Sequence, residues 1–207
     1  RIINDFSGEK TNILIGTQMV SKGLDFGKVS VVGILNADTM LNYPDFRAYE
    51  QAFTMMAQVS GRAGRKDRQG LVILQTRSPE SPVIRQLSGN DFKSFYHSLL
   101  EERRLFRYPP FTHIIYIYIR HKKEMIAETA ADSMATSLKN ILGDRVLGPD
   151  KPSVARIKQM AIRKIMLKLE NGINLDKVRD CLHKEESRIM QQQRFATVQV
   201  IFDVDPL

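Results

Sequence analysis

The sequence has 207 residues and is poor in cysteine, because Cys181 is the only one. A single cysteine forms neither an internal disulfide bond nor a zinc site built from cysteines, and it fits a reducing compartment. No apolar run reaches the ~18 residues that a membrane-spanning helix needs. The start, Arg1-Ile2-Ile3-Asn4-Asp5, has no signal-peptide character and no initiator methionine. These absences predict a cytoplasmic location and no membrane partner, and they suggest a piece of a longer protein.

A Walker A loop, the phosphate-binding segment with the pattern G-x-x-x-x-G-K-[ST], is missing as well. The two segments that come nearest to it, 7–11 and 143–148, lack the required spacing. The 4 histidines show no common spacing, so we predict no metal site in this chain. What the sequence does have is a net charge of +8, which favours a polyanionic partner.

The segment from Ile13 to Phe26 is an apolar run that leads into a polar loop with glycines. In a parallel α/β sheet, ligands gather where strands end and loops begin. Gly16 and Gly23 have no Cβ, so backbone amides can come close to a phosphate there. Lys22 adds a positive charge, and Asp25 supplies an acceptor for a ribose hydroxyl. This loop is predicted to bind a sugar-phosphate chain on one side and a nucleotide on the other.

A second segment, Gln58 to Arg65, is a helical run that ends in two arginines on a glycine-rich turn. Arg62 and Arg65 are three residues apart, which on a helical turn aims both guanidinium groups at one point. Guanidinium matches phosphate in a bidentate way, and such arginines commonly stabilise the charge on a transferred phosphoryl group. The alternative is a helix that ends at Gly61, with two solvated arginines at its carboxyl end.

The segments around these two loops predict an α/β fold. Continuous apolar runs of the kind expected for buried parallel strands lie at 12–15, 29–35 and 71–75. A helix is predicted to start near Asp45, its expected N-cap, with Phe53, Met56 and Ala57 on the inner face.

After Thr76 the composition changes. Two short predicted helices, 83–87 and 91–106, lead to the rigid boundary Tyr108-Pro109-Pro110-Phe111. From there the pattern predicts a compact α+β domain with the helices on one face of its sheet. Its strands are expected at 113–120, 161–169 and 195–204, with a short strand or turn at 146–149 and helices at 124–142 and 174–192.

One segment of this domain, Lys151 to Lys168, is basic and contains no acidic residue. Its basic residues are Lys151, Arg156, Lys158, Arg163, Lys164 and Lys168. Three interpretations stay open: contact with a phosphate backbone, contact with an acidic peptide, and a solvated rim on an ordinary sheet.

Several segments together carry a resemblance to a known family: Gly16-Thr17-Gln18-Met19, Lys22-Gly23, Asp25-Phe26, Pro44-Asp45-Phe46-Arg47-Ala48, 58–65, 70–76 and Asp203-Val204-Asp205-Pro206. The loop and the arginine segment are similar to motifs V and VI of superfamily 2 helicases. The whole set resembles the carboxyl-terminal part of bacterial replication-restart, or primosomal, DNA helicases. It covers essentially the entire chain.

The resemblance implies the distal part of a second RecA-like helicase lobe with a parallel sheet at 1–80, a helical connector at 81–110 and a small α+β carboxyl-terminal domain at 111–207. It also implies an ATP-dependent DNA helicase that moves 3′ to 5′ and acts at abandoned replication forks. The implied partners are DNA, single-stranded DNA-binding protein, primosome proteins and the replicative helicase.

Carried over to this sequence, the resemblance implies that Gly16 and Thr17 contact a DNA backbone phosphate. It implies that Asp25 binds the ATP ribose, with Lys22 and Gly23 in the same nucleotide-binding loop. This is the polar loop that the residues themselves mark as a binding site.

The resemblance further implies that Gln58, Arg62 and Arg65 contact the triphosphate and support catalysis. The family tends to show an Arg-aromatic-Arg-aromatic-Gln run where this chain has 160–164. Arg163 and Lys164 are therefore candidate substitutes for contacts to DNA or to single-stranded DNA-binding protein.

The family's Walker A loop, acidic metal-binding motif and zinc-binding cysteines are absent from this sequence. Mg²⁺ is therefore expected on another lobe, Zn²⁺ belongs to the full-length family, and this chain is expected to be inactive alone. Two alternative functions stay open. One is a non-catalytic DNA- or protein-binding module, and the other is a different superfamily 2 translocase.

Overall fold

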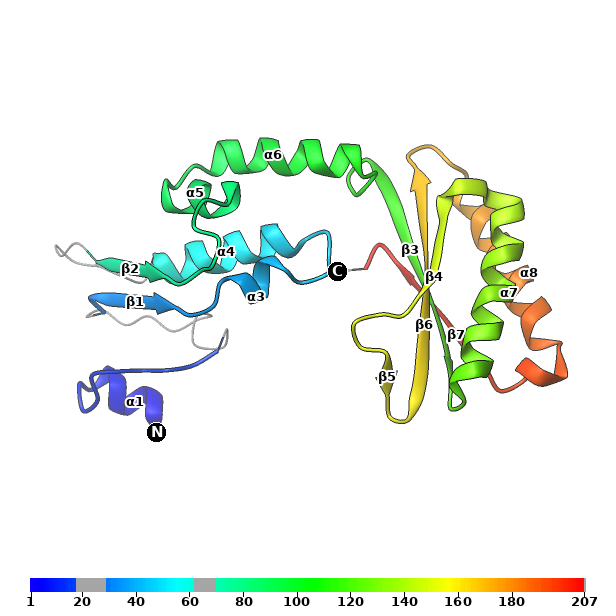
Figure 1. Ribbon diagram of the computed structural model, residues 1–207, viewed down its shortest axis with the longest axis horizontal. Helices are drawn as coiled ribbons and strands as arrows, with labels where there is room; N and C mark the ends of the chain where they lie inside the picture. The colour runs from blue at the N-terminus through cyan, green and yellow to red at the C-terminus, as the bar shows by residue number, and fades with distance from the viewer. Residues whose placement is uncertain (18–28, 62–69, 207) are drawn as a thin grey trace. The chain divides into compact units, whose positions relative to one another are not determined.

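The computed structural model describes residues 1–17, 29–61 and 70–206, in two compact units, Arg1–Leu100 and Glu101–Leu207 (Figure 1). The division falls inside one helix, α6 (Phe92–Leu105). The connector expected at 81–110 is thus shared between the two units. Each unit has a hydrophobic core of its own, so each is described by itself.

The first unit is built on a pair of parallel strands. In chain order its elements are α1 (Ile2–Ser7), β1 (Val31–Ile34), α3 (Asp38–Leu41), α4 (Ala48–Ser60), β2 (Leu71–Leu74), α5 (Pro82–Ser88) and the start of α6. Val31 of β1 lies opposite Leu71 of β2, and Ile34 lies opposite Leu74. The predicted parallel sheet is confirmed for these strands, and α4 belongs to the crossover that parallel pairing requires.

The apolar side of α4 forms the core beside this strand pair. Met56 and Ala52 are buried in one cluster with Ile34 of β1 and Ile84 of α5. Phe53 packs on α6, where its ring stacks on Phe95 with centroids 4.2 Å apart. Helix burial of this kind stabilises a fold by about 1.5–3 kcal/mol for each large apolar side chain.

Three local predictions for this unit are wrong. Ala57 is exposed, because the buried stripe of α4 follows Ala52 and Met56 and position 57 lies to one side of it. The helix begins after Arg47, and the Asp45 carboxylate accepts a hydrogen bond from the Arg47 amide at 2.8 Å instead of capping α4. Residues 12–15 form no strand.

The apolar run at 12–15 lacks the neighbour that a strand needs. Ile13 and Ile15 are 78% and 86% exposed. In the described part of the chain, the parallel sheet consists of β1 and β2 alone, paired with each other. A strand requires an adjacent backbone for its hydrogen bonds, so apolar composition by itself does not create one.

The second unit is the α+β domain that the sequence predicts. Its elements are β3 (Thr112–His121), α7 (Glu124–Leu142), β4 (Val146–Asp150), β5 (Arg156–Ile157), β6 (Met160–Glu170), α8 (Leu175–Met190) and β7 (Gln199–Val204). The sheet order is β4-β6-β3-β7, all neighbours are antiparallel, and β5 pairs with β6 as a short hairpin.

The helices α7 and α8 lie side by side on one face of this sheet, as predicted (Figure 1). Alternate residues of the two central strands point into the core that they share with the helices. These include Ile117 of β3 and Leu167 of β6, which meet Met134 of α7 and Leu182 of α8. The last strand starts at Gln199 and is shorter than expected, because residue 195 ends a 3₁₀ turn and residues 196–197 form a further turn.

Among the helices of the described ranges, none has the length and apolar character that a bilayer crossing requires.

Candidate functional site

The carboxyl ends of β1 and β2 are joined by a single carboxylate. Asp38, at the start of α3, accepts a hydrogen bond from the Thr76 hydroxyl at 2.7 Å and another from the Arg77 amide at 2.9 Å. The backbone adds to this connection, because Ala37 N donates to Gln75 O at 3.0 Å. The two loops that follow the parallel strands are therefore fixed to each other.

The same hydrogen bonds hold the pKa of Asp38 below its ordinary value. The largest cause is the Arg77 amide, followed by the Thr76 hydroxyl. At neutral pH the Asp38 carboxylate is therefore ionised and keeps both hydrogen bonds. We call the connection that it makes to Thr76 and Arg77 the Asp38–Thr76 clasp. Since ligands in open α/β sheets bind outside the carboxyl ends of strands, the clasp lies at the edge where chemistry is expected.

The described part of the segment Gln58 to Arg65 lies at the carboxyl end of α4. Gln58, in the last turn of α4, is exposed, while Met56 two residues earlier is fully buried. The helix ends at Gly61, where the Gly61 amide donates to Ala57 O at 3.0 Å. The buried side of α4 thus holds the helix in place and leaves the side chain of Gln58 open to a ligand.

Of the remaining residues predicted for this site, only some lie within the described ranges. Gly16 and Thr17 are exposed and lie outside regular secondary structure. Lys22, Gly23 and Asp25 lie outside the described residues. The same is true of Arg62 and Arg65. Their predicted roles stay predictions. Among the residues expected to contact the nucleotide, Gln58 is the one that lies within the described ranges.

The segment before α4 forms a compact turn. The Arg47 guanidinium pairs with the Asp45 carboxylate at 3.2 Å and lies over the Phe46 ring, 5.2 Å from its centroid. Both ionic side chains are about one-fifth exposed. The ion pair and the cation–π contact thus link three consecutive residues, and they set the direction in which the chain enters α4.

In the second unit, Arg163 lies between two carboxylates of α7. Its side chain is 8% exposed, and its Nη2 donates to Glu124 at 2.9 Å and to Glu128 at 3.4 Å. Lys151 and Arg156 also pair with Glu124, at 3.3 and 3.6 Å. The Arg163 hydrogen bond is the main cause that lowers the pKa of Glu124, and Lys151 is the next.

This placement favours a structural role for Arg163, because its guanidinium is buried and paired within the domain. Lys164 comes next along β6, so its side chain points to the opposite face. There its Nζ lies 4.6 Å from the centroid of the Tyr116 ring. The structure therefore does not bring the two candidate DNA-binding residues together on one surface.

Further along β6, Lys168 contacts the segment between α6 and β3. Its Nζ donates to Phe106 O at 2.7 Å and lies 3.6 Å from the centroid of the Tyr108 ring. Burial, and then the charge of Arg107, lower the pKa of Lys168. Of the basic segment 151–168, two residues thus make internal contacts on the face opposite the helices and three surround Glu124.

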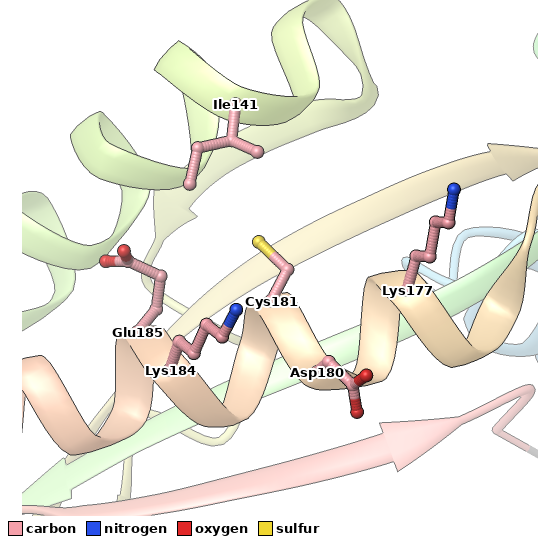
Figure 2. A pocket seen from close by; sticks show the side chains of 6 residues that line it. All are labelled: Ile141, Lys177, Asp180, Cys181, Lys184 and Glu185. Carbon is pink, nitrogen blue, oxygen red and sulfur yellow. The ribbon is translucent and has the colours of Figure 1, made fainter.

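A shallow cavity of about 390 Å³ lies between α7 and α8 (Figure 2). Its lining consists of Ile141, Lys177, Asp180, Cys181, Lys184 and Glu185. Cys181 is half-buried, and burial raises the pKa of its thiol, so the thiol stays protonated at neutral pH. The predicted ATP- and DNA-binding residues that the structure describes, Gly16, Thr17, Gln58, Arg163 and Lys164, do not line this cavity. In the described part of the chain, no group of three or more histidine, cysteine or acidic side chains is placed to hold a metal ion.

Comparison with known proteins follows the same division into two parts. Residues 1–67 match the family model "Helicase conserved C-terminal domain", and residues 104–207 match "Primosomal protein N C-terminal domain". The chain is 34% identical over its full length to the replication restart protein PriA of Bacillus subtilis, of which it covers 26%. It is 40% identical over 80% of its length to the PriA protein of Treponema pallidum, again covering 26% of that protein.

A parallel strand pair with a helix that leads into Gln-x-x-Gly-Arg-x-Gly-Arg, followed by an α+β domain, defines part of a RecA-like helicase lobe with a carboxyl-terminal domain. A further relative, the PriA protein of Haemophilus influenzae, is 32% identical over 99% of the chain. The chain belongs to the PriA family of replication restart proteins. It spans about a quarter of the length of these curated relatives.

Two features of the structure were not predicted from the sequence. The Asp38–Thr76 clasp joins residues 38 positions apart, and the only signal for it is an acidic residue four positions after the end of β1. The pairing of Arg163 with Glu124 and Glu128 joins residues that are 39 and 35 positions apart. A buried strand position occupied by arginine was the available signal, since such a residue needs a carboxylate.

Proposed function

We propose that this chain is the carboxyl-terminal part of an ATP-dependent DNA helicase that moves 3′ to 5′ and restarts stalled replication forks. The observation that carries the proposal is the agreement of the whole chain with proteins named for replication restart. The geometry of the first unit supports it, because α4 presents Gln58 in the turn just before the two arginines.

In this proposal, Arg62 and Arg65 face the triphosphate of ATP and stabilise the charge that develops during phosphoryl transfer. Gln58 contacts the same phosphates, and Asp25 binds the ribose beside Lys22. The phosphate loop and the Mg²⁺ ligands belong to the other helicase lobe, since this sequence has no Walker A loop. Gly16 and Thr17 bind the DNA backbone, which makes the contact tolerant of sequence and sensitive to salt.

The proposed protein partners are single-stranded DNA-binding protein, primosome proteins and the replicative helicase. Lys164 is the better placed of the two candidate residues for such a contact, because it is partly exposed while Arg163 is buried. The partners meet the carboxyl-terminal domain in this proposal, and the helicase lobe meets ATP.

The test is the ATPase activity of the whole protein carrying Arg65→Ala. We expect DNA-stimulated turnover to fall on the order of a hundredfold, with a smaller change in KM for ATP, because the arginine acts on the transition state. Arg85→Ala is the matched control, since Arg85 is an exposed arginine of α5 that pairs with Glu80. Near-normal turnover of the Arg65→Ala variant would contradict the assignment. A wild-type protein without DNA-stimulated ATPase would instead favour a non-catalytic binding module.

A further inference from the structure

Gln58 and the Asp38–Thr76 clasp lie at opposite ends of the parallel strand pair. β1 leads through α3 into α4, and α4 returns the chain to the start of β2, so α4 runs against both strands (Figure 1). Gln58, in the last turn of α4, therefore lies toward the end where β2 begins. Asp38 and Thr76 lie at the other end, where the strands finish. Strands of this length, at about 3.3 Å per residue, separate the two ends by roughly 13 Å.

The end of the strands is also the side of Gly16 and Thr17. The segment that contains them, 9–17, runs in the direction of β1 and stops on the side of α3 (Figure 1). Both residues are exposed, and in the proposed function they contact the DNA backbone. The clasp thus lies on the DNA side of this unit, whereas Gln58 lies on the nucleotide side.

The clasp fixes the backbone of the loop that follows β2. One oxygen of the Asp38 carboxylate accepts from the Thr76 hydroxyl at 2.7 Å, and the other accepts from the Arg77 amide at 2.9 Å. The Thr76 hydroxyl oxygen in turn accepts from the Ser78 amide at 3.0 Å. The Ser81 amide then donates to Ser78 O at 3.0 Å. Arg77 is therefore held in place from both sides along the chain.

The guanidinium group of Arg77, by contrast, is open to a ligand. The other arginines that the structure describes in this unit each pair with a carboxylate of their own segment: Arg1 with Asp5, Arg47 with Asp45, and Arg85 with Glu80. Arg77 is exposed, and within residues 1–17, 29–61 and 70–100 no ion pair joins its guanidinium to a carboxylate. An unpaired guanidinium on a fixed backbone suits an anion, because little conformational freedom is lost when the anion binds.

We propose that Asp38 is a positioning residue that fixes the loop after β2, so that the Arg77 guanidinium binds a backbone phosphate of DNA beside Gly16 and Thr17. The proposal rests on the proposed function, and it adds a contact that lies outside the two helicase motifs. Asp38 does not touch DNA itself, because its carboxylate oxygens are occupied by Thr76 and Arg77. A guanidinium–phosphate contact carries no sequence information, so binding is expected to be independent of sequence.

The first test measures the ATPase activity of the whole protein against the concentration of single-stranded DNA. Arg77→Ala should raise the half-saturating DNA concentration on the order of tenfold at low salt, since one charge-assisted contact is lost. The slope of log affinity against log salt should become shallower by about 0.7. KM for ATP should not change in parallel, because Gln58 lies at the other end of the strands. Arg85→Ala is the matched control, since it removes one exposed arginine from the same unit.

The second test separates the position of Arg77 from the charge of Asp38. Asp38→Ala and Asp38→Asn both remove a negative charge, which by itself would strengthen DNA binding. Asp38→Ala also removes both hydrogen bonds, so it should weaken DNA binding about fivefold. The amide of Asp38→Asn accepts from the Arg77 amide and donates to the Thr76 hydroxyl oxygen, so this variant should stay within twofold of wild type. In an Arg77→Ala background, Asp38→Ala should have no further effect, because Asp38 acts through Arg77.

The outcomes distinguish this proposal from the proposed function. If DNA stimulates the wild type and Arg77→Ala stays within twofold of Arg85→Ala, the phosphate contact is wrong and the proposed function stands. A wild type without DNA-stimulated ATPase would overturn both. Tighter DNA binding by Asp38→Ala, or an equal effect of Asp38→Ala with and without Arg77, would overturn the positioning role. Should Asp38→Ala melt at a lower temperature than wild type, Thr76→Val replaces it, with an expected loss of DNA affinity of about threefold.

Discussion

Arg163 shows that neighbouring residues decide the role of a guanidinium group. In the sequence it belongs to a basic segment that fits a phosphate backbone. In the structure its side chain is 8% exposed, and carboxylates of Glu124 and Glu128 accept its hydrogen bonds. A paired guanidinium inside a domain satisfies buried charge and contributes to stability, so its removal leaves two carboxylates with fewer partners.

We predict that Arg163→Met lowers the free energy of unfolding by about 2 kcal/mol. Methionine keeps much of the apolar stem, so the loss measures mainly the missing ion pairs. The value lies below that of an isolated buried pair because Lys151 and Arg156 still reach Glu124. Chemical denaturation provides the measurement, with Lys164→Met on the other face of β6 as the control. DNA affinity should stay within twofold of wild type.

The opposite result would support the interpretation made from the sequence, in which Arg163 contacts a phosphate backbone. If Arg163→Met weakened DNA binding strongly while the free energy of unfolding stayed unchanged, Arg163 would be a DNA contact. The two readouts separate the roles, because a residue that only stabilises the domain does not change affinity under conditions where the domain is folded.

At the scale of helices and strands, local patterns predicted the second unit best. Helix α7 matches its predicted bounds, since Ala127, Ala131 and Met134 recur on one face and Gly143 ends it with a φ of 66°. The first unit was less predictable because a strand depends on its neighbour. Residues 12–15 have the composition of a strand but no partner in the described part of the chain.

The candidate site follows the same rule. Local motifs indicated Gln58 and the arginine turn, because each lies within one continuous segment. The Asp38–Thr76 clasp depends on which strands become neighbours. That information is distributed over the whole core and is not contained in any single segment.

Strand β4 depends on a glycine. Gly148 has a φ of 92°, and a Cβ there would lie 3.0 Å from Asp150 N and 3.0 Å from Lys164 O of the neighbouring strand. We predict that Gly148→Ala lowers the free energy of unfolding by about 2–3 kcal/mol, because backbone strain and a backbone clash add. Thermal or chemical denaturation measures the loss.

Gly172→Ala is the control for that prediction. Gly172 has a similar φ of 95°, but apart from its chain neighbours no atom of the described residues lies within 4 Å of a Cβ at this position. Its substitution should cost about 1 kcal/mol, which is the strain alone. Equal losses for the two variants would show that the contact with β6 relaxes freely, and the importance assigned to Gly148 in β4 would be wrong.

At the scale of the whole molecule, the chain contains separate cores for its two proposed tasks. Met56 is fully buried in the core of the parallel pair, and Leu167 is fully buried in the core of the α+β domain. A helicase lobe must change with its nucleotide, whereas a domain that holds DNA or a protein partner benefits from a fixed sheet. Because the two cores are independent, one unit can change its conformation while the sheet of the other stays fixed.

We therefore predict that a substitution that creates a cavity in one core increases local unfolding of that unit. Hydrogen exchange in the other unit should stay unchanged. Leu167→Ala should cost about 3 kcal/mol, since removing buried atoms leaves a cavity, and Met56→Ala should cost a similar amount. Native-state hydrogen exchange read by peptide mass spectrometry follows both units at once. Leu167→Ala should speed exchange in β3, β6 and α7 without affecting α4, and Met56→Ala should do the reverse. If either variant raised exchange equally across both units, the chain would open as one cooperative body, and the helicase lobe and the α+β domain would have to respond to their ligands together.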